Sequence, residues 1–280
     1  MKTSTILPLF ILSLILFACN EQESNKQVPK SEEVGMQDPK VNTEEIQSDF
    51  RKWWTYHTTN IKLSSNFIGI NEDLDTISKQ LFLIKLVTEN YIPLRVGSNE
   101  EIQTYQLFKL GNKADDSIKS TIKNVARTSL KYFEMEGMAF PEFEFTDLNG
   151  NTYTTASTKG KFLVVKTWFI RCKACILEFP ELNEFVENYK ERDDILFLSL
   201  ATDSATELEK FISKRDFNYQ VIPDQEDLIE RKLGFSIYPI HLVIDKTGKV
   251  SKVVDKASTL ISYMADEMEL ANNNIPTAPL

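Results

Sequence analysis

The stretch Lys161–Pro180 reads Lys-Phe-Leu-Val-Val-Lys-Thr-Trp-Phe-Ile-Arg-Cys-Lys-Ala-Cys-Ile-Leu-Glu-Phe-Pro. Its apolar run, Phe162 to Trp168, predicts a buried strand, and apolar residues at helical spacing follow from Cys175. Cys172 and Cys175 at the start of that helix would lie one turn apart on the same face, within disulfide reach. The partial positive charge of a helix N-terminus stabilises a thiolate. The pattern of strand, turn, Cys-x-x-Cys and helix therefore indicates redox chemistry.

Two other interpretations of the cysteine pair stay open. Cys-x-x-Cys is half of a zinc site, but a structural zinc needs four ligands. Beyond the pair the chain offers only Cys19, His57 and His241, at unsuitable spacings. The two cysteines are also compatible with inert core residues, since free cysteine is often buried.

The N-terminal residues predict the compartment. Lys2 precedes an apolar run from Ile6 to Phe17 that is too short to span a bilayer comfortably, so it is typical of a secretory signal. Leu16-Phe17-Ala18-Cys19 resembles the lipobox of bacterial lipoproteins, which implies cleavage before Cys19 and acylation of its thiol. The alternative is an ordinary signal peptide with an accidental cysteine. We expect a signal peptide over 1–18 and a flexible polar tether over 19–43, in a compartment where disulfides persist.

Length and charge limit the remaining possibilities. A chain of 280 residues has room for one or two domains with a sizeable core. The net charge of −9 and the lack of a basic stripe argue against a nucleic-acid partner.

Residues 44–137 carry no sequence motif that indicates a catalytic or binding chemistry. Their patterns predict short strands at 61–63 and 67–70, extended segments at 91–96 and 104–110, and a helix over 115–135. A further helix over 77–87 would be capped by Asp73 or Asp75. We expect His57, among aromatic and polar residues, to have a surface or packing role. The hypothesis is an accessory α+β domain that shields or docks the rest of the chain.

Residues 138–280 alternate strands with helices. Asn149-Gly150 between two β-rich segments predicts a hairpin, and Pro180 should bend the cysteine helix. The remaining patterns predict strands at 194–201, 219–222, 240–245 and 249–254, and helices at 204–215, 228–233 and 258–271. Such alternation, with a final hairpin, implies an α/β domain with a mixed sheet covered on both faces.

These residues resemble the thioredoxin fold, in the branch of membrane-anchored extracytoplasmic thiol-disulfide oxidoreductases of the ResA and TlpA type. Four matching stretches, which span the domain, carry the resemblance: Phe143–Gly150, Trp168–Pro180, Tyr238-Pro239 and Leu242–Val250. The resemblance implies an α/β thioredoxin-like redox domain over 138–280, preceded by the accessory domain over 44–137.

The resemblance also implies roles for individual residues. Cys172 would be the nucleophile and Cys175 the resolving thiol, with a redox-active disulfide between them. Pro239 would be the cis-proline that faces the pair, and Tyr238 would lie at the groove where a substrate strand pairs.

Further family positions are matched or changed in this chain. Glu178 matches a carboxylate that the family holds near the cysteines, and Trp168 matches a wall aromatic of the groove. Arg171 stands where relatives have Trp; with Lys173 it should lower the pKa of Cys172 and make the couple more oxidising. Glu178 would oppose this if ionised, or accept a proton if its pKa is raised. Lys166 occupies the position of a buried acid in thioredoxin, and we expect it to reach solvent.

The predicted function is an extracytoplasmic, membrane-anchored reductase of protein disulfides in the cell envelope, facing the periplasm. Its partners would be disulfide-bonded extracytoplasmic proteins and a membrane electron donor, with no metal and no other cofactor. One alternative is a thiol peroxidase, since peroxiredoxins share the fold. The other is a copper-binding module with Cys172, Cys175 and His241 as soft ligands, although a core role for His241 is the simpler interpretation.

Overall fold

The computed structural model describes residues 41–97 and 103–273. Its five-stranded sheet has the order β11-β10-β7-β8-β9, as expected for a thioredoxin-like fold. β7, β8 and β9 run parallel, and β10 pairs antiparallel with both β7 and β11. β7 lies at the centre of the sheet, and every one of its residues is buried. The strands are β7 (Phe162–Trp168), β8 (Ile195–Ala201), β9 (Gln220–Ile222), β10 (Ile240–Ile244) and β11 (Val250–Val254).

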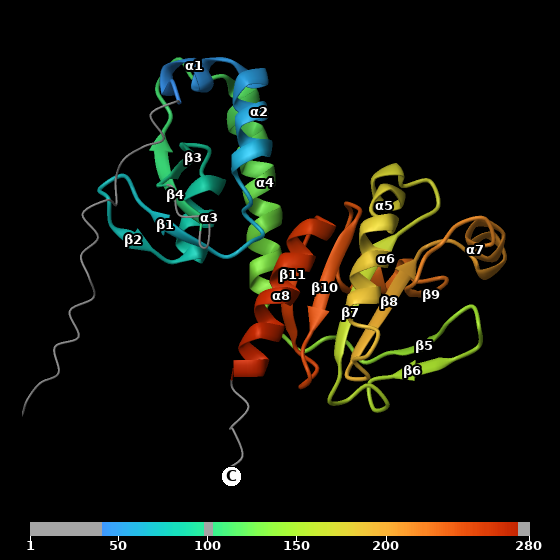
Figure 1. Ribbon diagram of the computed structural model, residues 1–280. Coiled ribbons are helices and arrows are strands. Elements are labelled where there is room, and N and C mark those ends of the chain that lie inside the picture. The colour runs from blue at the N-terminus through green and yellow to red at the C-terminus, as the bar shows by residue number, and fades with distance from the viewer. Residues whose placement is uncertain (1–40, 98–102, 274–280) are drawn as a thin grey trace, which may run out of the picture. The chain divides into compact units, whose positions relative to one another are not determined.

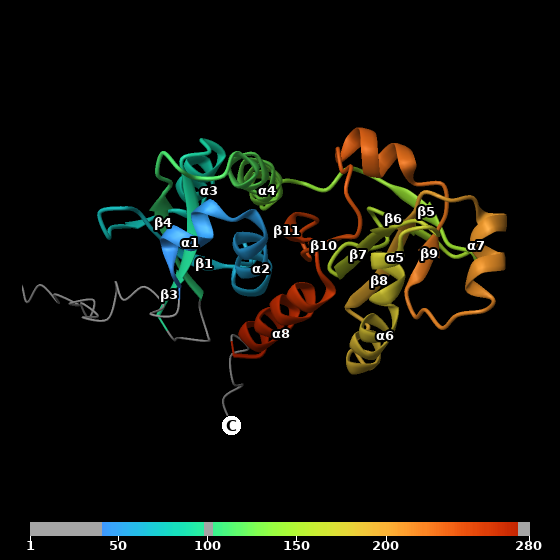
Figure 2. The same ribbon diagram turned by 90° about the horizontal axis from the view of Figure 1, so that it is seen from above.

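Helices cover this sheet, as the alternating pattern predicts. α6 (Phe179–Asn188) and α8 (Ala257–Asn273) share one core cluster with Val164 and Val243 of the sheet, and Figure 2 shows both helices on the same side of it. Leu163 and Leu242 point the other way, into a cluster that includes the π-helix η1 (Asp227–Lys232). α7 (Ala205–Ile212) packs through Leu208 beside the cysteine pair. The α/β thioredoxin-like fold is confirmed.

The predicted hairpin and bent helix are also present. β5 (Glu144–Thr146) and β6 (Thr152–Thr154) pair antiparallel around the turn at Gly150, which has a φ of +82°. The cysteine helix is interrupted rather than merely bent: α5 (Lys173–Leu177) is followed by Glu178, which caps it, and α6 begins at Phe179 with Pro180 in its first turn (Figure 1).

The segment between 41 and 137 has its own mixed sheet, of order β2-β1-β4-β3. Trp53, Phe82, Tyr105 and Ile122 are fully buried in its core. The predicted strands at 67–70, 91–96 and 104–110 and the helix at 115–135 are confirmed. The elements are α1 (Thr43–Ser48), α2 (Phe50–Asn60), β1 (Phe67–Ile70), β2 (Thr76–Ile77), α3 (Lys79–Val87), β3 (Tyr91–Val96), β4 (Gln103–Lys109) and α4 (Asp116–Met135).

Two local predictions in this segment are wrong. Residues 61–63 form no strand: the Ile61 N–H caps α2, and the Lys62 N–H donates to the Tyr105 hydroxyl at 3.0 Å. Helix α3 is capped by Ser78 rather than by Asp73 or Asp75, because Thr76–Ile77 pair with β1 as a short strand.

Other predictions remain untested. The signal peptide over 1–18, Cys19 and most of the tether over 19–43 lie outside the described residues, and the division at 137/138 into accessory and redox domains stays a prediction. Among the residues that are described, none of the helices has both the length and the apolarity that crossing a membrane requires.

Candidate active site

The two cysteines of the motif are joined by a disulfide in this structure. Cys172 is the N-cap of α5, and its Sγ accepts a hydrogen bond from the Cys175 N–H at 3.2 Å. Cys172 retains 7% exposure, whereas Cys175 is fully buried. The sulfur at the helix start is therefore the one that a partner molecule can reach.

Glu178 gathers three elements around one carboxylate. Its Oε2 lies 2.5 Å from Nζ of Lys166 on β7 and 3.2 Å from Nε2 of His241 on β10. Its Oε1 accepts the Ala257 N–H at the start of α8, at 3.0 Å. Since a carboxylate oxygen only accepts, Nε2 of His241 carries the hydrogen. Glu178 is held in place by all three contacts.

The cluster has a definite charge arrangement. Burial opposes ionisation of Glu178, but hydrogen bonds from His241 and Lys166, with the positive charge of Lys166, outweigh it and hold its pKa at about 2. Burial lowers the pKa of His241, so the neutral imidazole is favoured. Burial also lowers the pKa of Lys166, while the Glu178 carboxylate opposes that change. The central feature is a buried ammonium–carboxylate pair, with a neutral histidine beside it.

Two predictions about this cluster are corrected. Lys166 does not reach solvent: it is fully buried, because β7 is the central strand and both faces of the sheet are covered. The condition for Glu178 to accept a proton, a raised pKa, is not met, since its pKa is lowered. An ionised carboxylate with so low a pKa is a weak base.

Trp168 does not line a groove. Its side chain is fully buried, its indole N–H donates to the Ser199 hydroxyl at 3.0 Å, and its ring packs edge-on against Phe179. It belongs to the core cluster that contains both cysteines. Trp168 therefore packs in the core beside the cysteine pair.

Tyr238 lies beside the same cluster, as expected for a residue of the groove. The Tyr238–Pro239 bond is cis, as the resemblance implies. The Tyr238 ring packs against the cluster of the two cysteines and meets Phe169 edge-on, at 5.2 Å between ring centroids. The Tyr238 hydroxyl donates to Glu230 at 3.1 Å, and this hydrogen bond holds the ring in place. Burial and the hydrogen bond to Glu230 both raise the pKa of Tyr238. No separate signal in the sequence points to Phe169.

Comparison with known proteins finds relatives of the part of the chain that carries the cysteine pair. Residues 137–253 match the model of the AhpC/TSA family. The chain is 26% identical over 123 residues to the thiol-disulfide oxidoreductase ResA of Geobacillus thermodenitrificans, covering 44% of this chain and 71% of the relative. It is 29% identical over 133 residues to ResA of Bacillus cereus, covering 46% and 77%. The chain is a ResA-like thiol-disulfide oxidoreductase.

One solved structure gives a further comparison. The thioredoxin domain of a thiol-disulfide oxidoreductase from Bacteroides vulgatus aligns with a TM-score of 0.43 at 20% identity, over 47% of this chain and 96% of that one. In this ResA-like chain, the family match includes the cysteine pair, Glu178 and the cis-proline, and it leaves out residues 41–136.

Two basic residues lie next to Cys172 in the chain. Arg171 and Lys173 flank Cys172, and both side chains are exposed. Arg171 also lines a surface pocket of about 430 Å³ together with residues of α7. Sequence reasoning did not connect α7 with the cysteine motif, because the two are far apart along the chain.

The copper alternative has no support in this oxidoreductase. His241 is directed to Glu178, and the described residues contain no group of three or more His, Cys, Asp or Glu side chains able to hold a metal ion. The interpretation of His241 as a core residue is confirmed by its complete burial.

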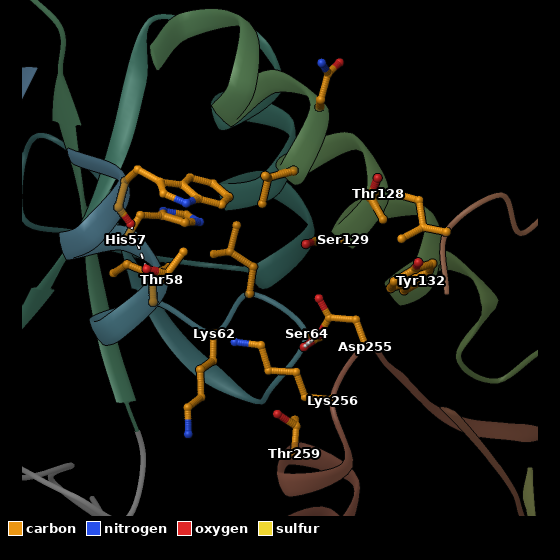
Figure 3. Close-up of a pocket in the computed structure, with 16 residues that line it drawn as sticks. His57, Thr58, Lys62, Ser64, Thr128, Ser129, Tyr132, Asp255, Lys256 and Thr259 are labelled. Carbon is orange, nitrogen blue, oxygen red and sulfur yellow. Dashed lines mark hydrogen bonds between the residues drawn. The ribbon is translucent and has the colours of Figure 1, made fainter. Parts of the chain in front are cut away.

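A second cavity, of about 360 Å³, has neither cysteine in its lining; Figure 3 shows the residues that line it. Its wall includes His57 of α2, Ser129 of α4 and Lys256, which follows β11; Figure 3 shows His57 and Lys256 on different sides of it. The His57 ring is buried, packs against Trp53 at 5.1 Å between centroids, and has its pKa lowered to about 4 by burial and by Lys256. The predicted packing role of His57 is confirmed.

Proposed function

We propose that this oxidoreductase reduces disulfides of extracytoplasmic proteins, with Cys172 as nucleophile and Cys175 as resolving thiol. The observation that carries the assignment is the asymmetry of the pair. Cys172 is the helix N-cap and partly accessible, whereas Cys175 is fully buried. A thiolate at a helix N-terminus is stabilised by the local dipole and by unpaired N–H groups.

The reaction starts from the dithiol form. The Cys172 thiolate attacks one sulfur of the substrate disulfide; that bond breaks, and the departing substrate thiolate takes up a proton. The Cys175 thiol then loses its proton, and its thiolate attacks Sγ of Cys172 in the mixed disulfide; the second substrate thiolate is released and takes up a proton. The substrate gains two electrons and two protons, and the protein is left with the Cys172–Cys175 disulfide. A membrane electron-donor protein would restore the dithiol.

Glu178 acts as a positioning residue in this proposal rather than as the proton acceptor. Its carboxylate is ionised and already holds Lys166, His241 and the start of α8. Because Glu178 stands directly between α5 and α6, these contacts fix the junction three residues after Cys175. Tyr238 and Pro239 would offer backbone to an extended substrate, with Arg171 at the edge of the same groove.

The test is reduction of a protein disulfide such as that of insulin by the dithiol form of the full chain. We expect Cys172→Ala to abolish turnover and Cys175→Ala to trap a mixed disulfide with the substrate. If Cys172→Ala still reduced the disulfide at the wild-type rate, the assignment of Cys172 as nucleophile would be wrong. Turnover of hydrogen peroxide with sulfenic acid at Cys172 would instead favour the peroxidase alternative, which the AhpC/TSA match keeps open.

The reduction potential decides the direction of electron flow. A potential near that of thioredoxin, about −270 mV, would support a reductase. A value near that of DsbA, about −120 mV, would mean that Arg171 and Lys173 dominate and that the protein forms or isomerises disulfides.

Cell-envelope location through lipid on Cys19 is a separate part of the proposal and rests on the lipobox alone. Fractionation of Cys19→Ala tests it. Wild-type protein should be recovered with membranes and the variant should not; recovery of both with membranes would remove the lipid anchor from the proposal.

A further inference from the structure

A positively charged pocket adjoins the redox-active cysteines. It has a volume of about 430 Å³ and begins at Ile170 and Arg171, the two residues that precede Cys172. Four of its lining residues are basic and two are acidic: Arg171, Lys210, Lys214 and Arg215 against Asp203 and Glu207. A local excess of positive charge is unexpected in a chain whose net charge is −9.

The two acidic residues are engaged in local structure. Asp203 Oδ2 accepts the Ile170 N–H at 2.8 Å and so ties the loop before Cys172 to the end of β8. Glu207 completes the capping box of α7, where its Oε2 accepts the Ser204 hydroxyl at 2.6 Å. Hydrogen bonds from Ser204, together with the charge of Arg171, lower the pKa of Glu207.

The basic residues are more available to a partner. Within the described part of the chain, Arg171, Lys210 and Lys214 form no ion pair with a carboxylate, and all three are exposed. Arg215 is held over the Phe211 ring at 3.8 Å and donates to the Phe211 carbonyl. These cations therefore have unused capacity for carboxylates.

We propose that this pocket binds carboxylate side chains that flank the disulfide of a polypeptide substrate, and so selects acidic substrates. The inference rests on the proposed reductase function and specifies its substrate class. A substrate disulfide in contact with Cys172 brings its neighbouring residues to Ile170 and Arg171, which are part of the pocket wall. Clustered charge of one sign raises the encounter rate of oppositely charged partners and lowers that of like-charged ones.

The experiment uses the full chain in its dithiol form and three cystine peptides that differ only in the flanking residues: aspartate, asparagine or lysine. The readout is the ratio of kcat/KM for the acidic peptide to that for the neutral one. We expect a ratio of about ten at low salt, the lower end of electrostatic steering. The ratio should fall as ionic strength rises, and the lysine peptide should be the poorest substrate.

Charge reversal locates the effect. Lys210→Glu/Lys214→Glu should lower the ratio below one, because it reverses the local excess of positive charge among the lining residues. The matched control is Lys159→Glu/Lys113→Glu, which changes net charge equally at exposed positions outside the pocket, and it should keep the wild-type preference.

The results of this experiment distinguish a failure of acidic substrate selection from a failure of the reductase function. Equal rates for the three peptides, or the same loss of preference in both double variants, would overturn acidic selection and leave the reductase function standing. If the dithiol form reduces none of the peptides, the reductase function itself falls.

Discussion

Lys166 Nζ and Glu178 Oε2 lie 2.5 Å apart beneath the cysteine motif, in a pair whose lysine is completely buried. Removing one partner from a buried ion pair leaves an uncompensated charge, which costs more than losing an exposed pair. The contact joins the central strand to the junction between α5 and α6. Its integrity should therefore affect both the stability of the protein and the position of the cysteine helix.

Lys166→Met should destabilise the protein by about 3 kcal/mol, because Glu178 then remains ionised without its cation. Urea unfolding measures this as a lower midpoint. The double variant Lys166→Met/Glu178→Gln should recover part of the loss, since neither charge remains. Lys190→Met, which breaks the exposed pair with Glu187, is the matched control and should cost about 0–1 kcal/mol. Equal losses for Lys166→Met and Lys190→Met would contradict a buried role for Lys166.

The lowered pKa of Glu178 predicts an acid-sensitive contribution to stability. Its pKa is about 2 in the folded chain, against an ordinary value of 4.5. As pH falls, the unfolded chain therefore binds the proton first. The stabilisation is complete above about pH 4.5 and is lost toward pH 2; at about 1.4 kcal/mol for each pH unit, it amounts to at most about 3 kcal/mol.

Denaturant midpoints between pH 6 and pH 2 would measure this contribution. Glu178→Gln should have a lower denaturant midpoint than wild type at pH 6. This gap in midpoint should narrow as pH falls from about 4.5 toward 2. Glu187→Gln, at an exposed carboxylate, serves as the control. A gap that stays constant down to pH 2 would show that folding does not lower the pKa of Glu178.

The sequence predicted the fold well because its signals are local. Alternation of apolar residues, the Asn149-Gly150 turn and the spacing of the cysteines each specify one element. It failed for Lys166 and Trp168, whose environments depend on strands and helices that are distant along the chain. A lysine within an apolar strand does not reveal that Glu178 and His241 meet it. The basic residues of α7 were missed for the same reason, since only folding brings them beside Arg171.

Burial of Trp168 predicts a cost for losing its hydrogen-bond partner. Ser199→Ala should destabilise the protein by about 1–3 kcal/mol, because the buried indole N–H is left without an acceptor. Trp168→Phe removes that donor, so the added cost of Ser199→Ala should be smaller in the Trp168→Phe background. A double-mutant cycle by urea unfolding gives the coupling. Additive losses would mean that the indole N–H does not depend on Ser199.

The unequal burial of the two sulfurs predicts their order of alkylation. In the dithiol form, iodoacetamide should modify Cys172 well before Cys175, because Cys172 lies at the helix start with 7% exposure and Cys175 has none. Peptide mass spectrometry at successive times resolves the two sites, and Cys175 should stay slow in Cys172→Ala. Urea-unfolded protein is the control, in which both thiols should react at similar rates. Faster reaction at Cys175 in the native protein would reverse the nucleophile assignment, because the thiol that an external electrophile reaches first is also the one that a substrate disulfide meets.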